Sequence, residues 1–123
     1  MADGQASCAF AFREEIGAVT RLTLNAPEKL NALSAAMLAE LPQALEDLSQ
    51  EPQCKVIILV GAGRAFCAGH DLKEMQAKRA APDGGAAAIK DLFDQCAALM
   101  QLLPRLPQPV IAQVHGIATA AGC

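Results

Sequence analysis

The chain has 123 residues, a length that suits one domain, and 53% of them are hydrophobic although only 3% are aromatic. Its formal net charge is −3, with charges of both signs interspersed, which is unlike the basic face of a nucleic-acid-binding protein. No apolar run approaches the roughly 18 residues that a transmembrane helix needs. We therefore expect one domain over residues 1–123 with an aliphatic core, no nucleic-acid partner and no membrane partner.

The five cysteines, at positions 8, 54, 67, 96 and 123, include no C-x-x-C pair. An odd number of cysteines without metal-ligand spacing favours reduced thiols in a cytoplasmic protein over a disulfide framework or a metal site. The N-terminus has neither the hydrophobic stretch of a signal peptide nor the arginines of a transit peptide. The sequence therefore predicts a cytoplasmic protein with no bound metal, in which residues 1–7 form a disordered terminus.

The first elements in the chain are two short predicted strands, at residues 8–13 and 16–24, joined near Glu14 and Glu15. Ser34 is a good N-cap for a helix that runs to about residue 49, and Pro42 should kink or split that helix. Five apolar residues at helical spacing should form its buried stripe: Met37, Leu38, Leu41, Leu45 and Leu48.

The apolar, β-branched run at residues 55–60 predicts a strand that is covered on both faces. A short helix at residues 72–79, a mobile loop at 78–88, a long amphipathic helix and a second buried strand at 110–114 should follow. The expected apolar stripe of the long helix consists of Ile89, Leu92, Phe93, Cys96, Leu99, Met100 and Leu103. Residues 117–123 are small and could open another helix. Alternating strands and helices predict an α/β fold with a parallel sheet, right-handed crossovers and flanking helices.

Residues 66–73, Phe-Cys-Ala-Gly-His-Asp-Leu-Lys, connect the apolar strand to the start of the short helix through a glycine. Backbone N–H groups at such a turn lack partners within the helix and point outward. They can hold negative charge, either on a bound group or as it develops in a reaction. This stretch is therefore the first candidate for a functional site.

The chain resembles the enoyl-CoA hydratase/isomerase (crotonase) family in the order and spacing of three segments, which are residues 25–33, 66–75 and 109–118. The resemblance extends over residues 19–123 and corresponds to the N-terminal half of that family's fold. It implies a crotonase-like spiral of ββα units, of the kind also found in ClpP, that usually assembles as a trimer or a dimer of trimers. It also implies an acyl-CoA thioester as the ligand, with coenzyme A as part of the substrate and no separate cofactor.

The resemblance also implies roles for individual residues. The backbone N–H groups of His70 and Ala121 correspond to the two donors of an oxyanion hole, which stabilises the enolate of the thioester. Further positions match those that line the CoA side of the family's pocket: Lys29, Leu30, Ala68, Asp71, Leu72 and Lys73. Hydration of a 2-enoyl-CoA is the leading reaction, with double-bond isomerisation, thioester hydrolysis or acyl-CoA binding without catalysis as alternatives.

The sequence also departs from the family pattern. Residues 120–122 are Ala-Ala-Gly where common hydratases carry a glycine run, and His70 stands where most members have a small residue. The two glutamates that family hydratases use as acid and base correspond to positions beyond Cys123. The resemblance therefore predicts an acyl-CoA ligand and leaves the alternative reactions open.

Several side chains keep more than one interpretation. The imidazole of His70 could act as a general acid or base, or could simply be a partly exposed polar group. Asp71 could orient part of CoA or could satisfy the free N–H groups of a helix start. Lys29 and Lys73 could meet CoA phosphates or be solvated. Three residues have one favoured interpretation each: Cys67 as core filler, His115 as a strand-end residue and Glu74 as a candidate for pairing with Lys78.

Overall fold

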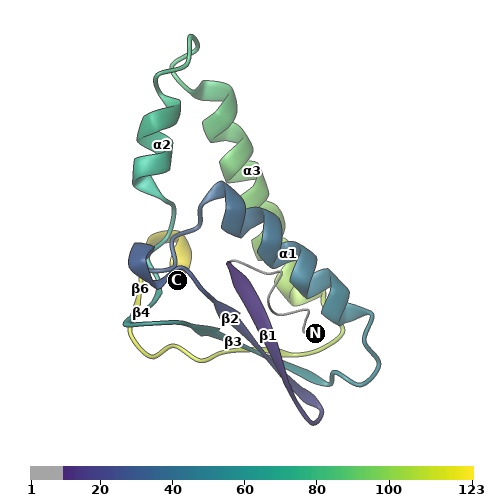
Figure 1. The fold of residues 1–123 in the computed structure, drawn as a ribbon. Helices are drawn as coiled ribbons and strands as arrows, with labels where there is room; N and C mark the ends of the chain where they lie inside the picture. The colour runs from purple at the N-terminus through teal and green to yellow at the C-terminus, as the bar shows by residue number, and fades with distance from the viewer. Residues whose placement is uncertain (1–9) are drawn as a thin grey trace, which may run out of the picture.

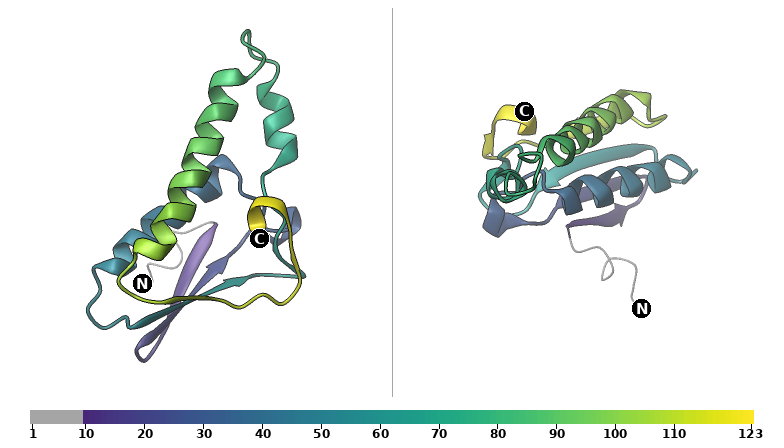
Figure 2. Two further views of the ribbon diagram at one scale, coloured as in Figure 1. Left: turned by 180° about the vertical axis from the view of Figure 1, so that it is seen from behind. Right: turned by 90° about the horizontal axis from the view of Figure 1, so that it is seen from above.

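The computed structural model describes residues 10–123, so the predicted disordered terminus at residues 1–7 and the beginning of the first predicted strand lie outside the described residues. A four-stranded sheet with the strand order β1-β2-β3-β5 forms the base of the fold. The long helices α1, Ala35–Ser49, and α3, Ala86–Leu102, lie over one face of this sheet (Figures 1 and 2). The core lies between these two layers.

The first two strands, β1 (Ala11–Ile16) and β2 (Val19–Leu24), form an antiparallel hairpin in which Ile16 pairs with Val19. The predicted connection near Glu14 and Glu15 is wrong, because both glutamates lie within β1. The chain turns instead at Gly17, whose φ of +63° suits the left-handed backbone of a tight two-residue hairpin loop.

Strand β3, Val56–Gly61, pairs in parallel with both β2 and β5, Val110–Ala112. The predicted parallel sheet is thus confirmed for these strands, and the antiparallel β1 makes the whole sheet mixed. Ile57 and Leu59 are buried, whereas Val56, Ile58 and Val60 are only partly buried. The prediction that this strand is covered on both faces is therefore wrong for the described residues, because both long helices cover the same face.

Helix α1 begins where the sequence predicts, since the Met37 N–H donates to Ser34 Oγ at 3.1 Å. All five residues of its predicted stripe are buried. Pro42 does not split it, because the helix continues from Ala35 to Ser49 without a break. A proline removes a single N–H from the helical ladder, and the burial of this apolar face offsets that loss.

Helix α2, Leu72–Lys78, confirms the predicted short helix, but α3 begins at Ala86 and so shortens the predicted loop. Asp83 explains this earlier start, because its carboxylate accepts hydrogen bonds from the N–H groups of Gly85 and Ala87. These bonds lower the pKa of Asp83. In the predicted stripe of α3, Phe93 and Met100 are 48% and 40% exposed, so the stripe is only partly buried.

The C-terminal segments differ most from the predictions. Strand β5 ends at Ala112 and lies at the edge of the sheet, where Ile111 is 53% exposed, so the predicted buried strand at 110–114 is wrong in both length and burial. Residues 117–123 do not open an α-helix. They form the short strand β6, Ile117–Ala118, and a 3₁₀ turn, Ala120–Gly122, labelled η4.

The short strand β4, Ala65–Cys67, and two other 3₁₀ turns, η2 (Pro27–Lys29) and η3 (Leu103–Arg105), complete the elements of the described chain. No helix in residues 10–123 combines the length and apolar character needed to cross a membrane.

Candidate active site

The two segments that the sequence singles out lie side by side in a small second sheet. Strand β4, Ala65–Cys67, pairs in parallel with β6, so that Ala65 faces Ile117 and Cys67 faces Ala118 (Figure 1). The Thr119 N–H then donates to the carbonyl of Cys67 at 3.2 Å. This pairing brings the 66–73 stretch against the end of the chain, although about fifty residues separate them in sequence.

Glycines permit this close approach. A side chain at Gly122 would collide with the carbonyl oxygen of Cys67, and one at Gly116 would collide with that of Arg64. Gly69 has a φ of +93°, and a Cβ there would lie 3.3 Å from the backbone nitrogen of Ala121. The backbone around Gly69 therefore packs directly against Ala121, and only glycine suits both the space and the left-handed conformation.

The backbone N–H groups of His70 and Ala121 are free. Within residues 10–123, neither donates a hydrogen bond to another backbone or side-chain group. Ala121 lies against Gly69, and His70 follows Gly69 in the chain, so the two donors belong to one small region of the surface. Unbonded N–H groups gathered in this way can bind an oxygen atom that carries negative charge.

The loop before α1 fixes the backbone on the other side of this region. The Leu33 N–H donates to the carbonyl of Gly69 at 2.7 Å, and the Ala68 N–H donates to that of Leu30 at 3.0 Å. Leu30 itself has a left-handed φ of 55°. The structure therefore brings the predicted residues Leu30, Ala68 and His70 together through backbone contacts.

Asn31 is the main structural residue that sequence reasoning missed. It is fully buried, and its Oδ1 accepts a hydrogen bond from the Ala26 N–H at 2.8 Å. Its Nδ2 donates to three carbonyl oxygens just before and at the beginning of the site, those of Ala62 (2.9 Å), Ala65 (2.9 Å) and Phe66 (3.2 Å). Its φ of 54° offers a partial signal, because asparagine tolerates the left-handed region better than other non-glycine residues.

Asp71 occupies the N-cap of α2. Its Oδ1 accepts a hydrogen bond from the Glu74 N–H at 3.1 Å, and its Oδ2 lies 3.6 Å from Lys29 Nζ. The Asp71 side chain is 10% exposed and that of Lys29 is 58% exposed. Of the two interpretations of Asp71, the structure therefore contains the helix-start carboxylate, which also holds the ammonium group of Lys29 near the site.

The remaining predicted residues of the CoA side, Leu72 and Lys73, lie on the exposed first turn of α2. Leu72 is 75% exposed, and Lys73 makes no ion pair within the described part of the chain. Within residues 10–123, Leu72 is therefore largely exposed and Lys73 has no ionic partner.

The predicted pairing of Glu74 with Lys78 is wrong. Glu74 Oε1 instead accepts a hydrogen bond from the Ala35 N–H at 2.8 Å, at the beginning of α1. A carboxylate there interacts favourably with the positive end of the helix dipole. This contact joins α2 to α1 across 39 residues of sequence, which is why helical spacing alone could not reveal it.

The imidazole of His70 contacts α3. Its ring lies 5.1 Å from that of Phe93, centroid to centroid, in an edge-to-face arrangement. Nδ1 of His70 is buried and has no hydrogen-bond partner among the described residues. His115 Nε2, in contrast, lies 2.6 Å from the carbonyl oxygen of Gly63 on an exposed side chain. Because β5 ends at Ala112, His115 lies in the connection between β5 and β6 and is not the strand-end residue that the sequence predicted.

Cys67 is buried, and this burial raises the pKa of its thiol. A backbone hydrogen bond with Gly69 lowers that pKa by less, and the nearby Cys96 raises it further. A protonated, buried thiol is a poor nucleophile, which agrees with the interpretation of Cys67 as core filler. No group of three or more potential metal ligands occurs within residues 10–123.

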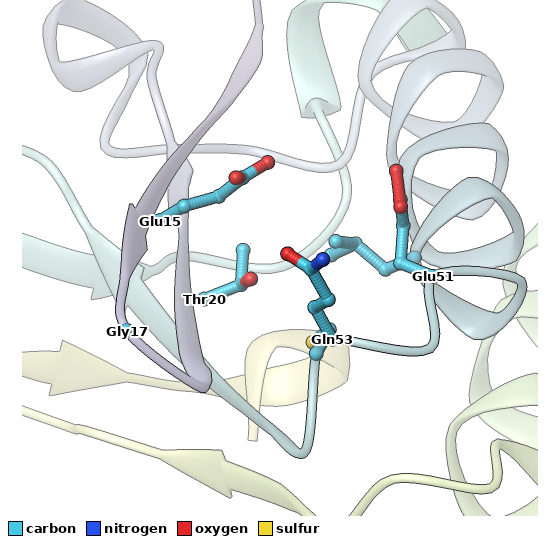
Figure 3. Close-up of a pocket in the computed structure, with 7 residues that line it drawn as sticks. Glu15, Gly17, Thr20, Glu51 and Gln53 are labelled. Atoms are coloured by element: carbon cyan, nitrogen blue, oxygen red, sulfur yellow. The ribbon is translucent and has the colours of Figure 1, made fainter.

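A separate cavity of about 80 Å³ lies at the opposite end of the sheet, between the hairpin turn and the segment that follows α1 (Figure 3). Its lining consists of Glu15, Gly17, Thr20, Leu48, Glu51, Gln53 and Cys54. None of these residues belongs to the predicted site. The chemistry of the unbonded amides, rather than this cavity, therefore identifies the candidate site.

Comparison with known proteins gives the family of the chain. A sequence model of the family described as enoyl-CoA hydratase/isomerase matches residues 14–123. The chain belongs to the enoyl-CoA hydratase/isomerase family. This membership confirms the resemblance that the three sequence segments indicated.

Relatives within the enoyl-CoA hydratase/isomerase family include the "enoyl-CoA hydratase domain-containing protein 3, mitochondrial" of Danio rerio. It is 39% identical over 117 residues, which cover 95% of this chain and 39% of the relative. The "1,2-epoxyphenylacetyl-CoA isomerase" of Escherichia coli (strain K12) is 38% identical over 106 residues, which cover 85% of this chain and 39% of the relative.

A solved structure supports the same conclusion for the fold. The crystal structure of an enoyl-CoA hydratase from Mycobacterium smegmatis matches with a TM-score of 0.84 and 47% identity, over 93% of this chain and 43% of that protein. The predicted crotonase-like α/β fold is thus confirmed. The chain spans about two fifths of the length of the family members that it matches.

Proposed function

We propose that this chain carries the thioester-binding part of an acyl-CoA enzyme, and that hydration of a 2-enoyl-CoA is the reaction it serves. The observation that carries this proposal is the pair of unbonded N–H groups of His70 and Ala121, held on either side of the close contact at Gly69. Membership of the enoyl-CoA hydratase/isomerase family supports an acyl-CoA thioester as the ligand.

In the proposed mechanism, both N–H groups donate to the thioester oxygen. As the double bond adds water or shifts, that oxygen becomes the oxygen of an enolate and gains negative charge. Fixed donors favour the charged oxygen over the neutral carbonyl, and loss of one such donor typically lowers the rate by about 10²–10³. Because both donors are backbone groups held by strand pairing and glycine packing, they need no reorganisation when the charge develops.

The CoA portion would lie against the loop before α1 and the first turn of α2. We assign contacts with it to Lys29, Leu30, Ala68, Asp71, Leu72 and Lys73. The ammonium groups of Lys29 and Lys73 would attract the CoA phosphates, and Asp71 would keep Lys29 in place through their 3.6 Å ion pair. The chemistry of these residues calls for no separate cofactor.

Proton transfer requires a side chain in addition to the two backbone donors. No carboxylate in the described chain bonds to the His70 ring, so we assign this imidazole no role as a general acid or base. Hydration, double-bond isomerisation and thioester hydrolysis all pass through a charged thioester oxygen, and this site would serve each of them. Hydration is preferred because hydratases recur among the relatives, although a CoA isomerase is also among them.

We also propose that the protein assembles as a homotrimer or hexamer in the cytoplasm. This assembly is supported by three half-exposed apolar residues near the sheet edge, which another subunit could bury: Ile111, Val114 and Ile117. Cys54, Cys67, Cys96 and Cys123 are free thiols, which supports a reducing compartment. The name of the Danio rerio relative states a mitochondrial location, so cell fractionation would decide between the two compartments.

The test measures hydration of crotonyl-CoA through the loss of its enoyl absorbance. The assay uses this chain and a version extended by any natural sequence after Cys123. Ala121→Pro removes the N–H donor, and Ala121→Gly is the matched control that keeps it. We expect Ala121→Pro to lower the rate by about 10²–10³ and Ala121→Gly to retain most of it.

Equal rates for Ala121→Pro and the unmodified protein would contradict the assignment of this donor. CoA thioester binding without any loss of the enoyl signal would instead reject hydration alone. Isomerisation of a 3-enoyl-CoA and release of free CoA thiol would then be measured on the same proteins to identify the reaction.

A further inference from the structure

The imidazole of His70 is placed in a way that its backbone role does not explain. Only the N–H of this residue is needed to bind the thioester oxygen, and any residue other than proline would supply it. The side chain is nevertheless held by an edge-to-face contact with Phe93, with 5.1 Å between the ring centroids and 73° between the planes. Phe93 lies on α3, so the ring of His70 contacts a separate element of the fold.

The two ring nitrogens of His70 differ in their surroundings. Nδ1 is buried without a hydrogen-bond partner, whereas Nε2 is neither buried in this way nor hydrogen-bonded to any group in residues 10–123. A buried N–H without an acceptor is rarer in proteins than a buried acceptor without a donor. We therefore assign the ring proton to Nε2, which makes this nitrogen a donor.

We propose that His70 Nε2–H is a positioning group that donates a hydrogen bond to an oxygen on the acyl part of the bound thioester. This inference rests on the proposed function, because the amide of the same residue is assigned to the thioester oxygen. Because the imidazole and one amide donor belong to the same residue, an acyl oxygen two carbons from the thioester carbonyl is the substituent that we expect the His70 side chain to reach. The site thus selects acyl groups that carry an oxygen at this carbon over hydrocarbon chains of the same length.

The selectivity follows from ordinary hydrogen-bond energetics. A neutral hydrogen bond exchanged with water changes affinity by about three- to tenfold. Phe93 increases this selectivity because it already holds the imidazole ring in place, and ligand binding does not have to order that ring. A side chain of the same shape without nitrogens would keep the packing against Phe93 and lose the selectivity.

The experiment compares the dissociation constants of acetoacetyl-CoA and butyryl-CoA by calorimetry. The former has a 3-oxo group that accepts a hydrogen bond, the latter has none, and neither contains an enoyl bond to hydrate. His70→Phe keeps a ring and the backbone N–H but removes the ring nitrogens. His70→Gln carries a side-chain amide that can replace Nε2–H. Met100→Leu is the control, because it changes another half-exposed residue of α3. The measured quantity is the ratio of the two constants.

We expect His70→Phe to reduce the preference for acetoacetyl-CoA by about three- to tenfold, His70→Gln to restore most of it, and Met100→Leu to leave it unchanged. A merely structural histidine would give the same ratio in all four proteins, and that result would overturn the inference while leaving the proposed function intact. Failure of the unmodified protein to bind either thioester would overturn both. A thermal melt of each variant separates these outcomes from a loss of folding.

Discussion

Replacement of Asn31 by alanine should destabilise the protein more than any other single polar substitution near the site. The side chain is fully buried and makes four hydrogen bonds, one with the Ala26 N–H and three with carbonyl oxygens in residues 62–66. Each intramolecular hydrogen bond contributes about 0.5–1.5 kcal/mol net, and a buried group left without a partner costs about 1–3 kcal/mol. Alanine also tolerates the φ of 54° less well than asparagine does.

These contributions do not add fully, because water can reach the partly buried Ala62 carbonyl once the side chain is removed. We therefore expect Asn31→Ala to lower the free energy of unfolding by about 3–4 kcal/mol. The measurement is urea unfolding followed by circular dichroism at several protein concentrations. Asn25→Ala is the matched control, since Asn25 lies in the same loop but its side chain makes no hydrogen bond within the described residues, and its cost should stay below about 0.5 kcal/mol.

A functional readout accompanies the measurement of stability. Asn31 ties the loop on the proposed CoA side to the segment before β4, so its loss should also weaken thioester binding under conditions in which the variant stays folded. If Asn31→Ala unfolds at the same urea concentration as the control variant, the four hydrogen bonds do not hold these two loops together and the reasoning fails.

Three further predictions concern neighbouring residues. Ala120→Gly should raise the free energy of unfolding by about 0.5–1 kcal/mol, because Ala120 has a φ of 52°, and an unchanged urea midpoint would argue against strain at this position. Glu74→Ala should lower the free energy of unfolding by about 1 kcal/mol, because the hydrogen bond from the Ala35 N–H is lost. Glu74→Gln should lower this free energy less, and equal effects of the two substitutions would contradict the capping role. Burial raises the pKa of the Cys67 thiol, so the folded protein keeps a proton that the unfolded chain releases near pH 8.5, and stability should fall as the pH rises above about 8.5. Cys67→Ala should make stability depend less on pH, as measured by urea unfolding between neutral and alkaline pH. An identical loss of stability in both proteins would contradict this role of the Cys67 thiol.

Local patterns predicted the elements whose physics is local. The stripe from Met37 to Leu48 and the Ser34 cap predicted α1 correctly, because helical spacing and capping depend on near neighbours. The parallel pairing of β3 followed from the alternation of strands and helices. The hairpin turn lies at Gly17, whose left-handed backbone allows a two-residue loop, whereas the charged pair before it pairs with β2 as part of β1.

Long-range partners account for most of what the sequence did not predict. Asn31 and Glu74 each bond to backbone groups more than thirty residues away, and no spacing rule identifies such partners. Phe93 likewise contacts the ring of His70, which belongs to a separate segment, so the helical period alone did not predict its surroundings. The adjacency of His70 and Ala121 was expected only from the family resemblance, because neither residue carries a local signal that links it to the other.

The vibrational frequency of the thioester carbonyl tests the central claim most directly. Butyryl-CoA labelled with ¹³C at the carbonyl would be bound to the protein, and its C=O stretch compared with that of the free ligand by isotope-edited infrared difference spectroscopy. Two N–H donors should shift the stretch of the bound ligand to lower frequency, and Ala121→Pro should reverse part of that shift while Ala121→Gly preserves it. A bound carbonyl with the same frequency as in water, or one that Ala121→Pro does not alter, would contradict the claim that His70 and Ala121 hold the thioester oxygen.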